Sequence, residues 1–319
     1  MKLVTVIAEY VALQRSLGMR FDSEPEIFKA FCRAIGDIEI DAVDPSPTLA
    51  FIAGTGPVTS NWHRKFSVLN SFYRFATTRG YVARSPLPMT IPKRPEPCLP
   101  YIYTREELRR LLTATAVLNT KCLGLKAYLE TSTLRVLLCT LYGTGIRIGE
   151  ALSLTLADVD LTAKIFTVRN SKFFKSRLVP LGSQLTTVLI PYAVSRQRLP
   201  VPAGKDSSFF STCMGTSLTR QRIEKNFQRL RILAKIQRND GARYQPRIHD
   251  LRHTFAVHRL ENWYRDGADV QRLLPCLSTY LGHVSVAASQ RYLSMTPELL
   301  REANRRFETY ATPEVSHDQ

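Results

Sequence analysis

Long apolar runs and paired cysteines are both missing from this chain. No stretch approaches the roughly 18 consecutive apolar residues of a transmembrane helix, and the residues after Met1 do not form the apolar core of a signal peptide. The six cysteines are scattered, with no CxxC pair and no clustered histidines beside them. This pattern argues against a disulfide framework and against a structural zinc site. We therefore expect a soluble, cytoplasmic protein with reduced cysteines, no membrane segment, no metal and no cofactor.

Acidic residues are also few relative to basic ones. The 319 residues include 44 Lys and Arg against 27 Asp and Glu, which gives a formal net charge of +17. Such an excess fits a polyanionic partner, because neutralising phosphates releases condensed counterions. Charge by itself leaves a basic protein without nucleic acid as the alternative. The length favours two domains, each large enough for its own hydrophobic core.

Residues 1–83 are predicted to form a small all-helical domain. Its clearest helix carries Trp62, Phe66, Leu69, Tyr73 and Ala76 at helical spacing, and a glycine at position 80 ends it. The other faces of this helix are basic, which fits either a solvated surface or contact with DNA. Those faces carry His63, Arg64, Lys65, Arg74 and Arg79.

Residues 84–103 contain six prolines and are predicted to form an extended linker, because proline cannot continue a helix. Lys93 and Arg94 on this segment are candidates for contact with a phosphate backbone. The second domain, residues 104–319, opens with a predicted capping box from Thr104 to Glu107. Helices are expected at 128–141 and 146–154, separated by glycines. These glycines lack GxGxxG spacing and a Walker lysine, which excludes a nucleotide-binding fold.

The pattern changes to strands between residues 159 and 181. Two strands, 165–168 and 177–181, flank a basic turn that carries Lys172 and Lys175 and together predict a β-hairpin. Helices are expected again at 183–196, 219–234 and 297–310. The predicted fold class is therefore α+β, mainly helical with a small β-hairpin or sheet.

The stretch from 248 to 295 carries the chemistry. His249 and Arg252 lie three residues apart and so share one face of a helical turn. His283 and then Tyr292 follow. Guanidinium groups clamp phosphate oxygens, imidazole transfers a proton or donates a hydrogen bond, and a phenol can act as a covalent nucleophile. These side chains together can carry out phosphoryl transfer without a metal.

The ordered set of motifs resembles the tyrosine recombinase/integrase family. The motifs are Gly145-Ile146-Arg147-Ile148-Gly149-Glu150, Ser171-Lys172 ahead of Arg177-Leu178-Val179-Pro180-Leu181, His249-Asp250-Leu251-Arg252-His253, Leu281-Gly282-His283 and Tyr292. The resemblance covers essentially the whole chain, and it implies an N-terminal SAM-like core-binding domain followed by the family's catalytic domain. The first domain matches by its architecture rather than by a motif.

The resemblance implies that Tyr292 attacks a scissile phosphodiester and forms a 3′-phosphotyrosine link. Arg147 and Arg252 would brace the non-bridging oxygens. His249 would exchange a proton with the tyrosine, and His283 would support the phosphate by a hydrogen bond.

In the hairpin turn, Lys172 matches the family's general acid, with Lys175 as its competitor. Glu150 fits two interpretations equally, an orienting partner of Arg147 or an ordinary helix salt bridge. His253 and His258 correspond to no motif position and are interpreted as structural.

The resemblance also implies the partners. These are duplex DNA with a specific site, a homotetramer in which the last helix docks on a neighbouring subunit, and sibling recombinases or accessory proteins. Integration or transposition of a mobile element is favoured over Xer-type dimer resolution. A type IB topoisomerase and a non-catalytic accessory subunit are the remaining alternatives, and we expect the protein at the nucleoid. The candidate DNA-contacting residues are Arg64, Lys65, Arg74, Lys93, Arg94, Lys175, Arg220 and Arg222.

Overall fold

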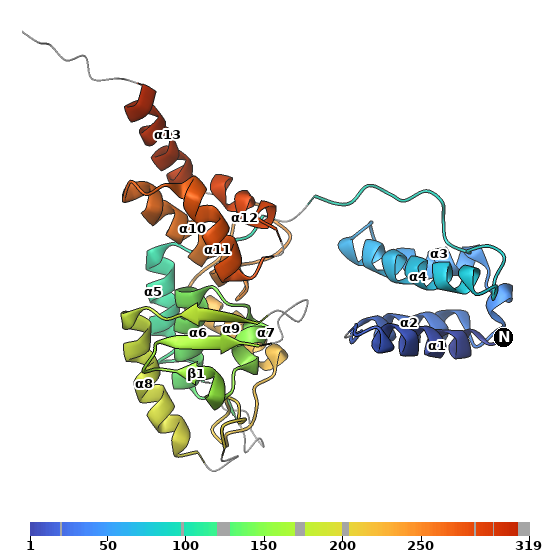
Figure 1. Ribbon diagram of the computed structural model, residues 1–319, viewed down its shortest axis with the longest axis horizontal. Coiled ribbons are helices and arrows are strands. Elements are labelled where there is room, and N and C mark those ends of the chain that lie inside the picture. Colours follow the sequence, from blue (N-terminus) through green and yellow to red (C-terminus); the bar gives the residue numbers. More distant parts are fainter. Residues whose placement is uncertain are drawn as a thin grey trace, which may run out of the picture. The chain divides into compact units, whose positions relative to one another are not determined.

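The chain divides into two compact units, Met1–Pro97 and Cys98–Gln319, in a computed structural model (Figure 1). The structure describes residues 1–319 except 20, 97–98, 120–127, 170–175, 200–203, 284, 296 and 312–319. The division between the units falls inside the proline-rich segment 84–103. Each unit has its own hydrophobic core.

The regular elements in the described residues of the first unit are helices. It contains α1 (Leu3–Ser16), α2 (Glu24–Ile35), a 3-10 turn (Ile40–Ala42), α3 (Pro45–Ala53) and α4 (Ser60–Thr78). Helices α1, α2 and α4 each bury an aromatic side chain in the core: the ring of Tyr10 lies 6.0 Å from Phe28 and 5.7 Å from Phe72, both edge-on. One prediction fails here. His63, expected on a polar face of α4, is buried beside the Trp62 ring.

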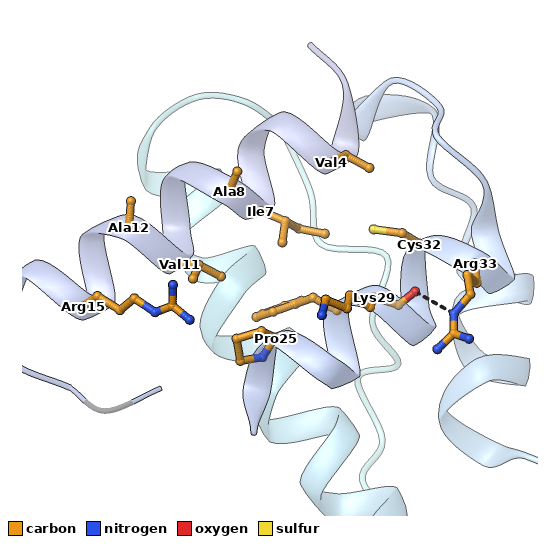
Figure 2. A pocket seen from close by; sticks show the side chains of 11 residues that line it. Val4, Ile7, Ala8, Val11, Ala12, Arg15, Pro25, Lys29, Cys32 and Arg33 are labelled. Carbon is orange, nitrogen blue, oxygen red and sulfur yellow. Dashed lines mark hydrogen bonds between the residues drawn. The ribbon is translucent and has the colours of Figure 1, made fainter. Parts of the chain in front are cut away.

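An apolar groove runs between α1 and α2 (Figure 2). Its cavity volume is about 790 Å³, and Ile7, Val11 and Pro25 are among its lining residues. Arg15 and Lys29 also border it.

The second unit surrounds a buried central helix. Its helices are α5 (Arg105–Ala114), α6 (Thr131–Thr144), α7 (Ile148–Ser153), α8 (Ser183–Gln197), α9 (Arg220–Leu233), α10 (Asp250–Arg265), α11 (Val270–Leu281), α12 (Ala287–Gln290) and α13 (Pro297–Ala311), with 3-10 helices at Leu156–Asp158 (η2) and Arg291–Ser294 (η4). The capping box is confirmed: Glu107 N donates to Thr104 Oγ1, and Thr104 N donates to Glu107 Oε2. Arg135 of α6 is exposed, but the leucines of this helix are buried and fill the centre of the core.

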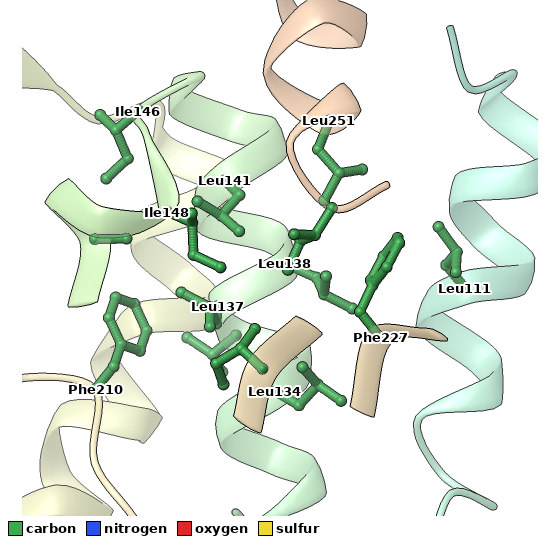
Figure 3. Close-up of a cluster of buried hydrophobic side chains, with 14 of the residues drawn as sticks. Leu111, Leu134, Leu137, Leu138, Leu141, Ile146, Ile148, Phe210, Phe227 and Leu251 are labelled. Atoms are coloured by element: carbon green, nitrogen blue, oxygen red, sulfur yellow. The ribbon is translucent and has the colours of Figure 1, made fainter. Parts of the chain in front are cut away.

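Figure 3 shows how this core is assembled. Leu134, Leu137 and Leu141 project from α6 toward side chains of other elements, including Phe227 of α9 and Leu251 of α10. This packing places the first turn of α10 beside the end of α6.

A three-stranded antiparallel sheet of order β1-β2-β3 completes the unit. Its strands are β1 (Val159–Asp160), β2 (Ile165–Val168) and β3 (Arg177–Pro180). The predicted hairpin is confirmed, with Val168 paired to Arg177 and Ile165 to Pro180. The short β1 adds a strand beside it. The predicted fold class, mainly helical with a small sheet, is confirmed as well.

A second buried cluster joins the C-terminal elements of this unit. Phe255 of α10, Leu277 of α11, Tyr292 of η4 and Leu299 of α13 all contribute to it. Across the described ranges, no helix combines the length and the apolar character needed to cross a bilayer.

Candidate active site

Two helix ends converge on the candidate site. Helix α6 ends at Gly145 and α11 ends at Gly282, both in the left-handed conformation, with φ of +63° and +68°. A Cβ on Gly145 would lie 2.4 Å from Cδ1 of Phe255, so the position has no space for a larger residue. The last carbonyls of a helix lack intrahelical partners and carry partial negative charge. They therefore favour cations at this place.

Arg252, in the first turn of α10, satisfies carbonyls from both helix ends. Its Nη1 donates to Gly145 O at 2.7 Å and its Nη2 to Leu281 O at 2.7 Å, and only 3% of the residue is exposed. Burial, with the nearby charge of Arg147, lowers the pKa of Arg252 to about 10. The guanidinium therefore stays charged at neutral pH.

Arg147 approaches the same place from the start of α7. As N-cap residue it has an extended backbone, and its Nη2 donates to Gly282 O at 2.9 Å. The α7 helix begins at Ile148, two residues after the start predicted from the sequence for the helix at 146–154. Arg147 and Arg252 thus hold carbonyls of adjacent residues, Gly282 and Leu281.

Glu150 connects Arg147 to a third arginine. It accepts from Arg147 Nη1 at 2.8 Å, and both of its oxygens accept from Arg177, at 3.1 and 2.8 Å. Burial alone would raise the pKa of this carboxyl, but the hydrogen bonds from Arg177 and Arg147 outweigh it and lower the pKa to about 2. Glu150 therefore forms an i,i+3 pair with Arg147 and also joins it to Arg177.

Arg177, at the start of β3, is a site residue that sequence reasoning missed. Its Nε also donates to Tyr280 O at 2.9 Å, which ties the hairpin to the end of α11. A signal was available: a charged residue at the first position of a strand, directly after the lysine-bearing turn.

Tyr292 is fully buried in η4, and its hydroxyl is hydrogen-bonded to Nδ1 of His253 at 3.2 Å. The histidine expected from the sequence to exchange a proton with Tyr292 is His249. Its ring centre lies 5.1 Å from that of His253. The interpretation of His253 as purely structural missed this contact. Its signal is the i,i+4 spacing from His249, which puts the two rings on one helix face.

The ring of His283 also lies near the ring of Tyr292. The two ring centres are 6.0 Å apart, and His283 Nδ1 is hydrogen-bonded to Ser289 Oγ at 2.7 Å. Burial, with the charges of Arg252 and Arg147, lowers the pKa of His283 to about 4. Burial and Arg252 also lower the pKa of His249. These imidazoles are therefore neutral at physiological pH.

The other candidate residues divide into three groups. Lys172 and Lys175 lie outside the described residues. Lys65 is engaged inside its own unit, where Nζ donates to Phe51 O at 2.6 Å and lies 4.2 Å from the centre of that ring. Arg220 forms an exposed ion pair with Glu224 at the start of α9. Arg222 is half-buried, and the exposed members of the set are Arg64, Arg74, Lys93 and Arg94.

Within the part of the chain that the structure describes, no group of three or more His, Cys, Asp or Glu side chains could hold a metal ion. The arrangement instead gathers two guanidinium groups beside a phenol and neutral imidazoles. Such a set can bind an anion with several oxygens and bring a nucleophile to it.

Residues 103–298 match the model of the phage integrase family. The chain belongs to that family. Its relatives include y4rB of Sinorhizobium fredii, named as an integrase/recombinase, which is 33% identical over 308 residues covering 95% of this chain and 96% of that protein. Tyrosine recombinase XerC of Oceanobacillus iheyensis is 31% identical over 310 residues, covering 94% of this chain and 93% of that protein. Membership supports a DNA recombinase.

Solved structures share the fold of this tyrosine recombinase. The Tn1549 transposon integrase in complex with transposon right end DNA superposes with a TM-score of 0.67 at 16% identity, covering 98% of this chain and 100% of that chain. A lambda integrase dimer bound to a core site gives 0.66 at 16% identity, covering 92% and 78%.

Proposed function

We propose that this chain is a site-specific DNA recombinase that cuts and rejoins duplex DNA through a 3′-phosphotyrosine intermediate on Tyr292. The observation that carries the proposal is the pair of guanidinium groups beside the tyrosine. The hydrogen bonds of Arg252 in the described structure go to backbone carbonyls, so its charge is left for an external anion. Each guanidinium group has five N–H donors. Arg252 uses two of them on its carbonyl partners, and Arg147 uses two on Glu150 and Gly282. The remaining donors suit the non-bridging oxygens of a phosphodiester.

The reaction follows from these groups. The Tyr292 oxygen bonds to phosphorus, the bond from phosphorus to the 5′ oxygen breaks, and the departing oxygen takes a proton. Arg147 and Arg252 stabilise the negative charge that builds on the non-bridging oxygens of the phosphate. Lys172 supplies the proton to the leaving oxygen, and His249 receives the proton of the tyrosine.

His283 supports the phosphate by a hydrogen bond. Because the tyrosyl ester preserves the energy of the broken bond, rejoining by a 5′ hydroxyl needs neither ATP nor metal.

Integration or transposition of a mobile element is the proposed biological role. The name of y4rB and the transposon integrase fold favour it, while the XerC relative keeps dimer resolution as the alternative. One related fold is a lambda integrase tetramer bound to a Holliday junction, which supports a homotetramer on two DNA sites. Helix α13 exposes 51% of Leu300 and 68% of Phe307, a surface suited to docking on a neighbouring subunit. Sibling recombinases or accessory proteins complete the proposed set of partners, at the nucleoid.

The proposal is tested with nicked duplexes tiled across the DNA that flanks the gene. The nick lets the short strand beyond the cleavage point diffuse away, which traps the covalent complex. With EDTA present, the wild type should give a protein–DNA band on a denaturing gel, and Tyr292→Phe should give none.

Tyr142→Phe is the matched control, because Tyr142 is also hydrogen-bonded to a histidine of α10, His258, at 3.0 Å. It should keep the band. Absence of a band on every duplex, despite salt-sensitive binding, would leave the accessory-subunit alternative. Relaxation of any supercoiled plasmid would favour the topoisomerase.

A further inference from the structure

The tyrosine proposed as nucleophile is hydrogen-bonded to His253, a residue interpreted from the sequence as structural. Nδ1 of His253 lies 3.2 Å from the hydroxyl oxygen of Tyr292, and the two ring centres are 5.6 Å apart. Both residues are buried. A buried hydroxyl without a partner would lose its hydrogen bonds to water, so this contact fixes where the hydroxyl lies.

Two different elements meet at this contact. His253 sits one residue after Arg252, near the start of α10, whereas Tyr292 lies in the short helix η4. The rigid α10 therefore holds Arg252 and the hydroxyl of Tyr292 in one fixed relation. Precise placement of a nucleophile relative to its electrophile contributes strongly to rate, and a displacement of about 1 Å can cost about 10²-fold.

We propose that His253 is a positioning residue of the cleavage reaction, which holds the Tyr292 hydroxyl beside Arg252 through a hydrogen bond to Nδ1. This inference rests on the proposed function and assigns His253 a different task from His249. His253 contributes to cleavage through this hydrogen bond and not by taking up a proton.

The electrostatic surroundings support holding over proton transfer. Burial, followed by the neighbouring His249 and Arg291, lowers the pKa of His253 to about 3. The ring is therefore neutral at physiological pH and resists a second proton. A neutral imidazole can hold this hydrogen bond through Nδ1 as donor or as acceptor, depending on its tautomer.

The same helix offers a matched pair outside the site. His258 is equally buried, is hydrogen-bonded through Nδ1 to the Tyr142 hydroxyl at 3.0 Å, and has a pKa lowered to about 4, chiefly by burial. Its loss should affect folding to a similar degree without touching the nucleophile. His258→Phe thus separates stability from positioning.

The test measures the single-turnover rate of covalent complex formation on the nicked duplex, at saturating protein. His253→Phe keeps the ring but removes Nδ1 and should be about 10²-fold slower, with unchanged DNA affinity. His253→Asn restores a hydrogen-bonding atom at the place of Nδ1 but cannot act as a base, and should recover to within about tenfold of wild type. His258→Phe should keep the wild-type rate.

Either of two results would overturn the inference while leaving the recombinase function standing. One is a His253→Phe rate equal to or above that of the wild type. The other is His253→Asn as slow as His253→Phe, which would assign proton transfer to His253. By contrast, a wild type that forms no covalent complex overturns the proposed function itself.

A second measurement needs no DNA and no histidine variant. In protein labelled with ¹⁵N-histidine, Tyr292→Phe should shift the ring nitrogen resonances of His253 and leave those of His258 in place. Unchanged His253 resonances would show that the hydrogen bond is absent, and would contradict the inference.

Discussion

At the scale of single residues, Glu150 joins two arginines of the candidate site. It accepts hydrogen bonds from Arg147 and from Arg177, which come from α7 and β3. A carboxylate between two guanidinium groups offsets their mutual repulsion. Arg147 can therefore keep its orientation toward the end of α11.

Glu150→Gln keeps the shape of the side chain and removes its charge. The substitution leaves the partly buried charges of Arg147 and Arg177 without their carboxylate, which is costly. We therefore expect a loss of about 3 kcal/mol in the free energy of unfolding, together with slower covalent complex formation. Glu106→Gln is the control, since the pair of Glu106 with Arg109 is exposed and should contribute under about 1 kcal/mol. Urea denaturation measures both, and equal losses would contradict the assignment.

Acid should destabilise the protein in two stages. The pKa of His253 is lowered to about 3 and that of His283 to about 4, both mainly by burial. Groups with depressed folded-state pKa values bind protons more weakly than in the unfolded chain, so their stabilisation is present above pH 6.5. It is lost as the pH falls from 6.5 to about 4 for His283 and to about 3 for His253. Glu150, whose carboxyl pKa falls from 4.5 to about 2, adds a loss below pH 4.5.

Unfolding free energies measured from pH 7.5 to 3 would check this prediction. Removing the Glu150 charge with Glu150→Gln should flatten the curve below pH 4.5 and leave the stage above it. A free energy of unfolding that rises as the pH is lowered from 6.5 to 4 would be incompatible with buried neutral histidines.

At the scale of elements, the site is built where helices end. Helices α6 and α11 end at glycines in the left-handed conformation, and the carbonyls exposed there hold Arg252 and Arg147. The helix ends thereby set the distance between the two guanidinium groups. A change in either end should move both arginines.

Gly145→Ala should be strongly destabilising, by about 2–4 kcal/mol, because it combines a strained φ with a contact of 2.4 Å to Phe255. Gly149→Ala is the matched control. Gly149 lies within α7 with nothing within 4 Å of an added Cβ, so alanine should be neutral or stabilising by about 0.5–1 kcal/mol. Thermal melts of the two variants would separate them, and equal effects would refute the packing argument.

Helix α13 has a buried and an exposed apolar side. Leu299 is fully buried in its own unit, whereas 68% of Phe307 is exposed. We expect Phe307→Ser to leave the melting temperature unchanged and to weaken assembly on DNA, because it removes apolar area available to a neighbouring subunit. Leu299→Ser should instead lower the melting temperature. Size-exclusion chromatography with light scattering would measure the assembly of each variant on DNA. Wild-type assembly of Phe307→Ser would contradict the prediction.

At the scale of the whole molecule, the positive charge is unevenly divided between the two units. Residues 1–97 hold 12 basic and 9 acidic residues, a net of +3, whereas residues 98–319 hold 32 and 18, a net of +14. The electrostatic attraction to DNA should therefore come mainly from the second unit. The total is the +17 of the complete chain.

DNA affinity should fall steeply with salt, because each neutralised phosphate contributes a slope of about −0.9 to the logarithm of the association constant plotted against the logarithm of the salt concentration. Arg220→Ala should make this slope shallower by the contribution of about one phosphate contact, and it should weaken binding to all DNA sequences alike. Lys29→Ala is the control, since Lys29 is exposed and paired with Glu26 in the first unit. Fluorescence anisotropy at several salt concentrations measures both, and equal slopes would argue against contact at Arg220.

The sequence by itself determined several elements of this protein. Apolar spacing placed α4 and α9, alternation and flanking polar residues placed β2 and β3, and local hydrogen-bonding chemistry placed the capping box at Thr104. These features depend on neighbours a few residues away in the chain, which periodicity reports directly. The ordered motifs likewise selected Arg147, Arg252, His283 and Tyr292 as candidates.

Only the tertiary structure decided which of these side chains meet. Arg177 and Glu150 lie 27 residues apart, and His253 and Tyr292 lie 39 apart. Periodicity predicts which face of a helix is buried but not which group it faces, so His253 was interpreted as structural and His63 as exposed. Partners across such separations follow from how α6, α10 and α11 pack, because a polar group that loses water must find its hydrogen bond in whatever element lies against it.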